Sequence, residues 1–216
     1  MLQSSETVTV TDYGTGKMRS SARRVKDIAA TSLESPKNAQ TLFRLVRFLS
    51  DKELHSGRED NPLNIIELGT NLGITTAYLA APSSKNKVCT LEGSKALTEI
   101  ARQNWRKLKA NNITAIEGNI DNTLAATLKQ LRQIDMAFID ANHTKEATMR
   151  YWHQIIPYIR QKSVVVIDDI HWSKEMEQAW KQIQNDRRVA CTMDLYDMGM
   201  VFFDPAYLHR NYRLRI

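Results

Sequence analysis

From residue 63 onward, short apolar runs alternate along the chain with segments in which apolar residues follow helical spacing. Leu63–Leu68 is a short apolar run and predicts a buried strand. In Lys95–Ala110, apolar residues at 97, 100, 101, 105 and 108 follow the 3.6-residue period of an amphipathic helix. The further predicted strands are Lys87–Leu91, Ile113–Ile116, Ile134–Ile139, Ser163–Ile167, Ala190–Leu195 and Met200–Phe203. The further predicted helices are Leu72–Ala81, Asp121–Gln133, Lys145–Ile159 and Trp172–Asn185.

This alternation predicts the fold class, which is α/β. Strand–helix units in series favour a mostly parallel sheet with helices on both faces. The last two strands are too close for a crossover helix, so they are predicted to pair as an antiparallel C-terminal hairpin. Upstream, Arg19–Leu33 and Pro36–Leu49 are predicted as two helices. They form an N-terminal helical extension over residues 1–50 of a single domain that spans residues 1–216, with its core in residues 63–204.

Composition fits this interpretation. The 216 residues are enough for one domain with a sizeable core, and 42% hydrophobic and 25% charged residues are ordinary for a globular protein. The N-terminus has no apolar signal-peptide segment, and no run approaches the ~18 apolar residues of a membrane span. The two cysteines are expected to be reduced core residues. We therefore expect a cytoplasmic protein that does not enter a membrane.

The formal net charge is +6, which favours anionic partners, including nucleic acid. The basic residues are scattered, however, apart from small clusters at residues 23–26 and 210–215. The plainer interpretation is that Lys and Arg solvate the helix faces.

Polar or acidic residues follow the first five predicted strands. In an open α/β sheet, ligands bind beyond the carboxyl ends of the strands, so these positions predict a binding site. The alternative is that they are only loop acids and helix caps. The positions are Glu67, Glu92, Glu117–Gly118–Asn119, Asp140 and Asp168–Asp169.

The stretch IIELGTNLGITT, residues 65–76, shows what such a site would bind. Gly69 lets the backbone turn tightly after the strand, and the amides of residues 71–74 at the next helix start can hold an anionic group. The spacing is G-x-x-x-G, not the G-x-G-x-x-G of dinucleotide sites, so pyrophosphate is disfavoured. Glu67 suits a cationic ligand, and Glu92 is placed to accept hydrogen bonds from ribose hydroxyls.

The chain resembles the class I S-adenosylmethionine-dependent methyltransferases in five features: ELGTNLG at residues 67–73, the acid Glu92, the EGN turn at residues 117–119, the strand-end Asp140 and the terminal hairpin. The resemblance covers about residues 36–204. It is nearest to the catechol and caffeoyl-CoA O-methyltransferase type, whose first motif often reads ELG-x-x-x-G. DYGTGK at residues 12–17 and DDIHWS at residues 168–173 also resemble a bacterial, largely uncharacterised subgroup. The resemblance implies a Rossmann-like sheet of seven strands.

The resemblance also implies S-adenosylmethionine as the cofactor. The loop after the first strand would hold its methionine part, Glu92 its ribose, and the loop at residues 118–120 its adenine. Asp121 would be either a further contact or a plain helix N-cap. The residues implied to bind the cofactor are Glu67, Gly69, Thr70, Asn71, Gly73, Glu92, Gly93, Gly118, Asn119, Ile120 and Asp140.

In the metal-dependent members of this family, a divalent cation sits beside the methyl donor. The resemblance places its ligands at Asp140, Asp168 and Asp169, although the family usually has Asn at the last position. Oxygen ligands suit Mg²⁺ or Ca²⁺, and the metal would lower the pKa of a bound hydroxyl. The rival interpretation is that Asp140 contacts the cofactor's ammonium side and that Asp168 and Asp169 cap the following helix.

Two histidines near these acids are candidate catalytic residues, together with Asp140. His143 lies three residues after Asp140, and an imidazole near neutrality can take the acceptor's proton. His171 lies two residues after Asp169. Trp172 is expected to pack in the core against the sheet, and the alternative is a wall of the pocket. Tyr13 is expected to line the acceptor pocket, and the alternative is an uninvolved terminus.

The function predicted from these residues is methyl transfer from S-adenosylmethionine to an oxygen of a small-molecule acceptor, with or without a divalent cation. A nucleic-acid methyltransferase is disfavoured because Asp140–Ala141–Asn142–His143 stands where base-methylating enzymes carry an Asn/Asp-Pro-Pro-Tyr/Phe motif. An NAD-dependent oxidoreductase is disfavoured by Asn71 in place of glycine. A non-catalytic module that binds the same cofactor stays open. Relatives are often dimers, so a homodimer is a further prediction.

Overall fold

The structure, a computed structural model, describes residues 4–13, 19–50 and 62–215. The chain divides into two compact units. The N-terminal unit comprises Met1–Leu63 and Glu67–Thr123, and the C-terminal unit comprises Asn64–Ile66 and Leu124–Ile216. Strand β3, Asn64–Leu68, contributes residues to both.

The fold is α/β with a Rossmann-like, mainly parallel sheet, as predicted. Among the described residues the sheet has eight strands in the order β10-β8-β9-β7-β6-β3-β4-β5. Neighbouring pairs β4–β5 and β6–β7 are parallel, and β9 runs antiparallel to both β7 and β8. The order places the predicted terminal hairpin, β8 and β9, beside the fifth predicted strand, β7.

The N-terminal unit contains the first strand–helix repeats. Its strands β4 (Lys87–Glu92) and β5 (Ile113–Glu117) lie within a residue of the predicted boundaries. Its helices α2 (Pro36–Leu49), α3 (Ile74–Ala80) and α4 (Lys95–Leu108) bury one apolar face each. Ser35 caps α2, accepting a hydrogen bond from the backbone N–H of Asn38, and Pro36 occupies the first turn, where no N–H is required.

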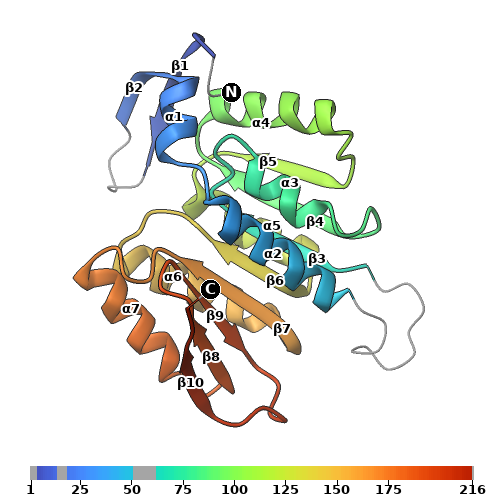
Figure 1. Cartoon of the computed structure of the whole chain (residues 1–216), viewed down its shortest axis with the longest axis vertical. Helices are drawn as coiled ribbons and strands as arrows, with labels where there is room; N and C mark the ends of the chain where they lie inside the picture. The colour runs from blue at the N-terminus through green and yellow to red at the C-terminus, as the bar shows by residue number, and fades with distance from the viewer. Residues whose placement is uncertain (1–3, 14–18, 51–61, 216) are drawn as a thin grey trace. The chain divides into compact units, whose positions relative to one another are not determined.

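The N-terminal extension differs from the prediction of helices alone. Its first part is a two-stranded antiparallel ribbon of β1 (Thr7–Asp12) and β2 (Arg19–Arg24), and the helix α1 covers only Val25–Thr31. Figure 1 shows the ribbon in blue at the start of the chain. Thr and Val alternate in β1, which is the two-residue period of a strand, and β2 is exposed along its whole length. Residues 14–17 of DYGTGK lie outside the described residues, so only Asp12 and Tyr13 of that segment are placed.

The C-terminal unit continues the alternation. Strands β6 (Ile134–Ile139) and β7 (Ile159–Asp168) are followed by helices α6 (Lys145–Ile155) and α7 (Lys174–Gln184), respectively. Helix α5 (Ile120–Leu131) precedes β6, and its first residues belong to the N-terminal unit. All six residues of β6 are buried, which fits an interior strand covered on both faces. Pro157 ends the predicted long helix early, because Ile156–Tyr158 forms a short 3₁₀ turn.

Within the described ranges, the sheet has one strand more than the seven predicted. After the hairpin of β8 (Cys191–Asp194) and β9 (Met198–Phe202), the strand β10 (Arg210–Arg213) pairs parallel to β8 at the sheet edge. Its sequence RNYR is mostly exposed and has no apolar alternation, so the usual signal of a strand is missing.

Both cysteines, Cys89 and Cys191, are free and buried, as expected. Burial raises the pKa of the Cys89 thiol to about 11. None of the helices in the described part of the chain has the length and apolar character that crossing a membrane requires.

Candidate active site

The predicted ribose acid, Glu92, is held by backbone amides at the end of β4. Its Oε2 accepts from the backbone N–H of Asn71 at 2.9 Å, and its Oε1 accepts from the backbone N–H of Ser94 at 2.8 Å. Burial raises the pKa of Glu92, and hydrogen bonds from the backbone of Ser94 and Asn71 oppose this shift. Two amides from different loops therefore fix the orientation of one carboxylate.

Three predicted cofactor loops meet at the end of β4 through main-chain hydrogen bonds. The N–H of Gly69 donates to the carbonyl of Leu91 at 3.0 Å, and the N–H of Gly118 donates to the carbonyl of Glu92 at 2.8 Å. Beyond Gly118, the Asn119 side chain accepts from the backbone N–H of Asp121 at 2.9 Å. Asn119, rather than Asp121, thus serves as the cap at the start of α5, just before Ile120.

Two of the four amides of residues 71–74 that were predicted to hold an anionic group have partners within the protein. The Asn71 amide donates to Glu92, and the Gly73 amide donates to the carbonyl of Thr70 at 2.8 Å. The Asn71 side chain donates to the carbonyl of Ser32 at 2.8 Å. These three hydrogen bonds shape the loop before α3.

Gly73 is required by packing as well as by backbone conformation. It starts α3 with φ 73°, a conformation that favours glycine. A Cβ atom at this position would lie 2.6 Å from Nε1 of Trp105 and 2.7 Å from Cβ of Ala101. The Trp105 indole N–H donates to the Gly73 carbonyl at 2.7 Å. The glycine thus lets α4 approach the loop closely.

Glu67 was predicted to contact the cofactor, but its side chain is fully buried within the N-terminal unit. Its Oε2 accepts from the hydroxyls of Thr76 at 2.5 Å and Thr90 at 2.6 Å. The hydroxyl of Thr90 also lies 2.6 Å from that of Thr70, a second predicted cofactor residue. Glu67 and Thr70 therefore belong to a buried polar network that ties β3, β4 and α3 together.

In the C-terminal unit, His143 lies between two predicted acids. Its Nε2 is 3.5 Å from Oδ1 of Asp140, and its Nδ1 is 3.4 Å from Oδ2 of Asp169. Burial lowers the pKa of His143, and the charge of Asp169 opposes this shift. His143 and Asp169 both have positive φ, 34° and 54°, so the two loops turn sharply where these side chains meet.

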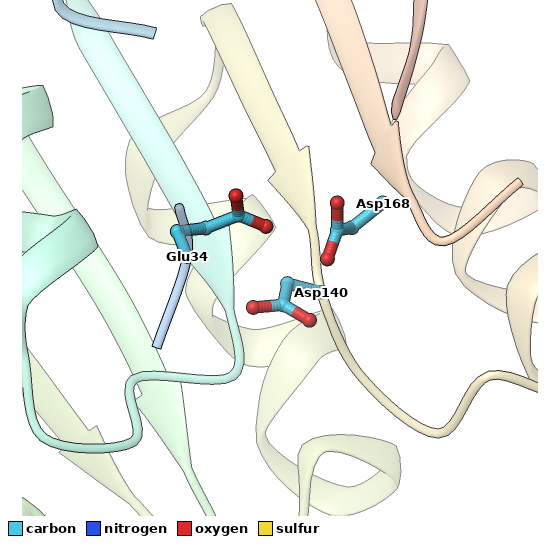
Figure 2. Close-up of side chains that lie close together, drawn as sticks. All are labelled: Glu34, Asp140 and Asp168. Atoms are coloured by element: carbon cyan, nitrogen blue, oxygen red, sulfur yellow. The ribbon is translucent and has the colours of Figure 1, made fainter. Parts of the chain in front are cut away.

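Two of the three predicted metal ligands come together. Carboxylate oxygens of Asp140 and Asp168 lie within 4.8 Å of each other at the ends of β6 and β7. Figure 2 draws both side chains, together with Glu34 of the N-terminal unit. Asp168 is buried, whereas Asp140 is partly exposed. The third predicted ligand, Asp169, is directed to His143 instead.

The rival role of Asp168 and Asp169 as caps of α7 is not observed. Ser173 is the N-cap residue, and its hydroxyl accepts from the backbone N–H of Met176. The two acids are therefore not the side-chain cap of this helix.

His171 has partners that differ from those of His143. Its Nε2 lies 3.0 Å from Oδ2 of Asp194, and its Nδ1 lies 3.5 Å from Oε1 of Glu177. Its ring also packs against that of Tyr196. These contacts link α7 to the end of β8, so they give no support to the predicted catalytic role. Trp172 is 73% exposed, so the expectation that it packs in the core was wrong.

Sequence reasoning missed several residues that shape the site. Thr76 and Thr90 hold Glu67, Ser94 holds Glu92, and Trp105 supports the loop at Gly73. Thr90 and Ser94 are fully buried although polar. A small hydroxyl residue inside a buried strand or directly after a strand-end acid was the available signal, because a buried hydroxyl needs a partner.

Residues 66–170 match the family model described as a methyltransferase domain. This segment of the chain is similar to methyltransferase domains. Apart from His171, every predicted cofactor, metal and catalytic residue lies within this domain. The match agrees with the predicted enzyme class, a methyltransferase.

Solved structures with the same fold as this chain include three methyltransferases. An O-methyltransferase from Bacillus cereus in complex with SAH is 22% identical, with 82% of this chain and 88% of that chain covered and a TM-score of 0.65. The SAH-bound methyltransferase PaMTH1 from Podospora anserina is 17% identical, with 81% of each chain covered and a TM-score of 0.66. The O-methyltransferase TomG from Streptomyces achromogenes, in complex with SAM, is 17% identical, with 79% of this chain and 81% of that chain covered and a TM-score of 0.63. At these identities the similarity establishes the fold of the methyltransferase domain. Among curated proteins, none matches the chain.

Proposed function

We propose that this protein transfers the methyl group of S-adenosylmethionine to an oxygen atom of a small-molecule acceptor. The observation that carries the proposal is the Glu92 carboxylate, held at the end of β4 by the amides of Asn71 and Ser94. Its setting within a methyltransferase domain supports a ribose-binding role. The similar folds of methyltransferases solved with SAH or SAM support the choice of cofactor.

The carboxylate of Glu92 is preorganised by the backbone around it. Its closest partners are the amides of Asn71 and Ser94, one on each oxygen, and the backbones of Thr70 and Gly93 also donate to it. A ribose hydroxyl would donate to a carboxylate whose orientation these groups already fix. Because the amides fix the carboxylate beforehand, little side-chain entropy is lost on binding.

His143 is assigned as the base that takes the acceptor's proton. With the proton of the neutral imidazole on Nδ1, directed to Asp169, the lone pair of Nε2 can accept the proton of the acceptor hydroxyl. The burial that lowers the pKa of His143 favours this neutral form. Methyl transfer to the acceptor oxygen would leave the hydroxyl proton on Nε2 of His143, with SAH as the second product.

Asp140 and Asp168 would hold a divalent cation. Mg²⁺ is often bound by one or two carboxylates with several waters retained, so this pair fits such an ion without Asp169. A bound cation would lower the pKa of the acceptor hydroxyl. The contacts of His143 with Asp140 and Asp169 orient its ring whether or not a cation is bound.

Calorimetry with SAH tests the cofactor assignment. The wild type is expected to bind, and Glu92→Gln is expected to bind about 10- to 100-fold more weakly, because hydrogen bonds to a charged acceptor are lost. Glu99→Gln is the matched control, since Glu99 lies on α4 of the same unit, outside the predicted site, with its side chain 52% exposed. No binding by the wild type would refute the proposed function, and undiminished binding by Glu92→Gln would refute the ribose assignment.

A panel of phenols, catechols and short RNAs, assayed by SAH release, tests the acceptor class. We expect turnover with hydroxylated small molecules and none with RNA. Assays in EDTA and in Mg²⁺ separate the metal contribution: equal rates would remove the cation from the proposal while leaving His143 as the base. The cytoplasmic location and the homodimer stay predictions.

A further inference from the structure

The N-terminal ribbon packs on the cofactor half of its own unit. Val10 of β1 is buried in an apolar cluster with Leu97 and Ile100 of α4. Next to it, the backbone N–H of Thr11 donates to the hydroxyl of Ser94 at 3.3 Å. Ser94 in turn donates its backbone N–H to Glu92. The end of β1 is therefore attached to the loop that fixes the proposed ribose acid.

Tyr13, directly after β1, lies against Gly93 in the same loop. A Cβ atom at position 93 would be 2.6 Å from Cδ2 and 2.9 Å from Cε2 of the Tyr13 ring. Real Cβ atoms do not approach ring carbons so closely, so any larger residue would displace the ring. The backbone of Gly93 is outside the left-handed region, so backbone conformation does not require glycine there. The close approach of the ring does.

Resting on the proposed function, we infer that Tyr13 is a cofactor-binding residue whose ring forms a wall of the site for the ribose and adenine of S-adenosylmethionine. Three observations support this: the contact with Gly93, the hydrogen bond from Thr11 to Ser94, and the position of Gly93 directly after Glu92. An aromatic ring offers a face on which an adenine base or a ribose can pack. Cofactor binding and docking of the ribbon should therefore favour each other.

The test is a double-mutant cycle on SAH affinity, measured by calorimetry. Tyr13→Ala is expected to weaken binding about 10-fold, the scale of a lost aromatic–base contact. Tyr13→Phe is expected to stay within about twofold, because the ring rather than the hydroxyl makes the contact with Gly93. Tyr212→Ala, on β10 of the C-terminal unit, is the matched control and should bind SAH like the wild type.

Gly93→Ala completes the cycle. In the wild-type background its methyl group should displace the ring and weaken SAH binding, whereas in the Tyr13→Ala background it should add little. Melting temperatures without ligand show whether each variant is folded. Equal SAH affinity of Tyr13→Ala and the wild type would overturn the inference and leave the proposed function standing, and so would an equal effect of Gly93→Ala in both backgrounds. Failure of the wild type to bind SAH would overturn both.

Discussion

The cofactor half in the N-terminal unit and the histidine–aspartate cluster in the C-terminal unit are built in different ways. In the cofactor half, Glu92 and Glu67 accept hydrogen bonds of 2.5–2.9 Å from backbone amides and buried hydroxyls. In the cluster, the contacts of His143 with its acids are 3.4–3.5 Å long, and its side chain is 33% exposed. The first region is fixed before any ligand arrives, whereas the second can tighten around one.

This difference suits two tasks. A cofactor that is the same in every turnover gains affinity from a preorganised site. Groups that move a proton often have long hydrogen bonds until the reactants are present. Substitutions should therefore separate the two regions: changes in the first should affect stability and SAH binding, and changes in the second should affect the rate.

The largest expected effect is that of His143→Ala. We expect kcat to fall about 10²- to 10⁴-fold, the usual contribution of a general base. The affinity for SAH and the melting temperature should stay close to those of the wild type, because the contacts of His143 are long and partly exposed. His153→Ala, an exposed histidine on α6, is the control. A kcat within twofold of the wild type would show that the cluster does not take the proton.

Glu67→Ala, a change in the cofactor half, should instead lower the stability of the fold. It leaves the buried hydroxyls of Thr76 and Thr90 without their acceptor, so the free energy of unfolding should fall by about 3 kcal/mol. Urea titration measures this change. Glu99→Ala, on the exposed face of α4, should change it by less than about 0.5 kcal/mol. Equal losses for the two variants would contradict the structural role of the Glu67 network.

The smallest expected effect concerns Asp194, the partner of His171. Burial acts to raise the pKa of Asp194, but hydrogen bonds from His171 and the Tyr196 backbone outweigh it, so the pKa is lowered. A lowered carboxyl pKa stabilises the fold above the unfolded pKa of about 3.9, and this stabilisation is lost as the pH falls through the folded value.

Asp194→Asn should therefore reduce the free energy of unfolding by about 1 kcal/mol at pH 7 and by progressively less below about pH 4. Denaturation at several pH values measures the difference. Asp197→Asn, at an exposed acid of the same turn, is the control. A difference that does not change with pH would show that the ionisation of Asp194 does not stabilise the fold. Loss of methyl transfer with unchanged stability would instead restore a catalytic role for His171.

Much of the fold could be predicted because its strands are buried runs with clear ends. All six residues of β6 are buried and five of them are apolar, the exception being Asp135, and Asp140 follows the run directly, so the apolar run marks its bounds. The ribbon could not be predicted in the same way. Every residue of β2 is exposed, and its pairing with β1 comes from a partner strand that is itself mostly polar.

The site was predictable as a set of positions but not as a set of contacts. A glutamate at a strand end can face a ligand or the interior, and the sequence does not distinguish the two. Glu92 ends β4 at the loops, whereas Glu67, one residue before the end of β3, faces the interior. Likewise, the positive φ of Asp169, which accompanies its contact with His143, has no signature in the residue type.

The contact between Gly73 and Trp105 also limits how the chain can diverge. A Cβ atom at position 73 is excluded by the indole and by Ala101, and the left-handed backbone there excludes most other residues again. A larger residue could be accepted only together with smaller ones at both positions 101 and 105, and the change at 105 would also remove the indole donor to the Gly73 carbonyl. Among homologues, glycine at position 73 is therefore expected wherever tryptophan stands at position 105.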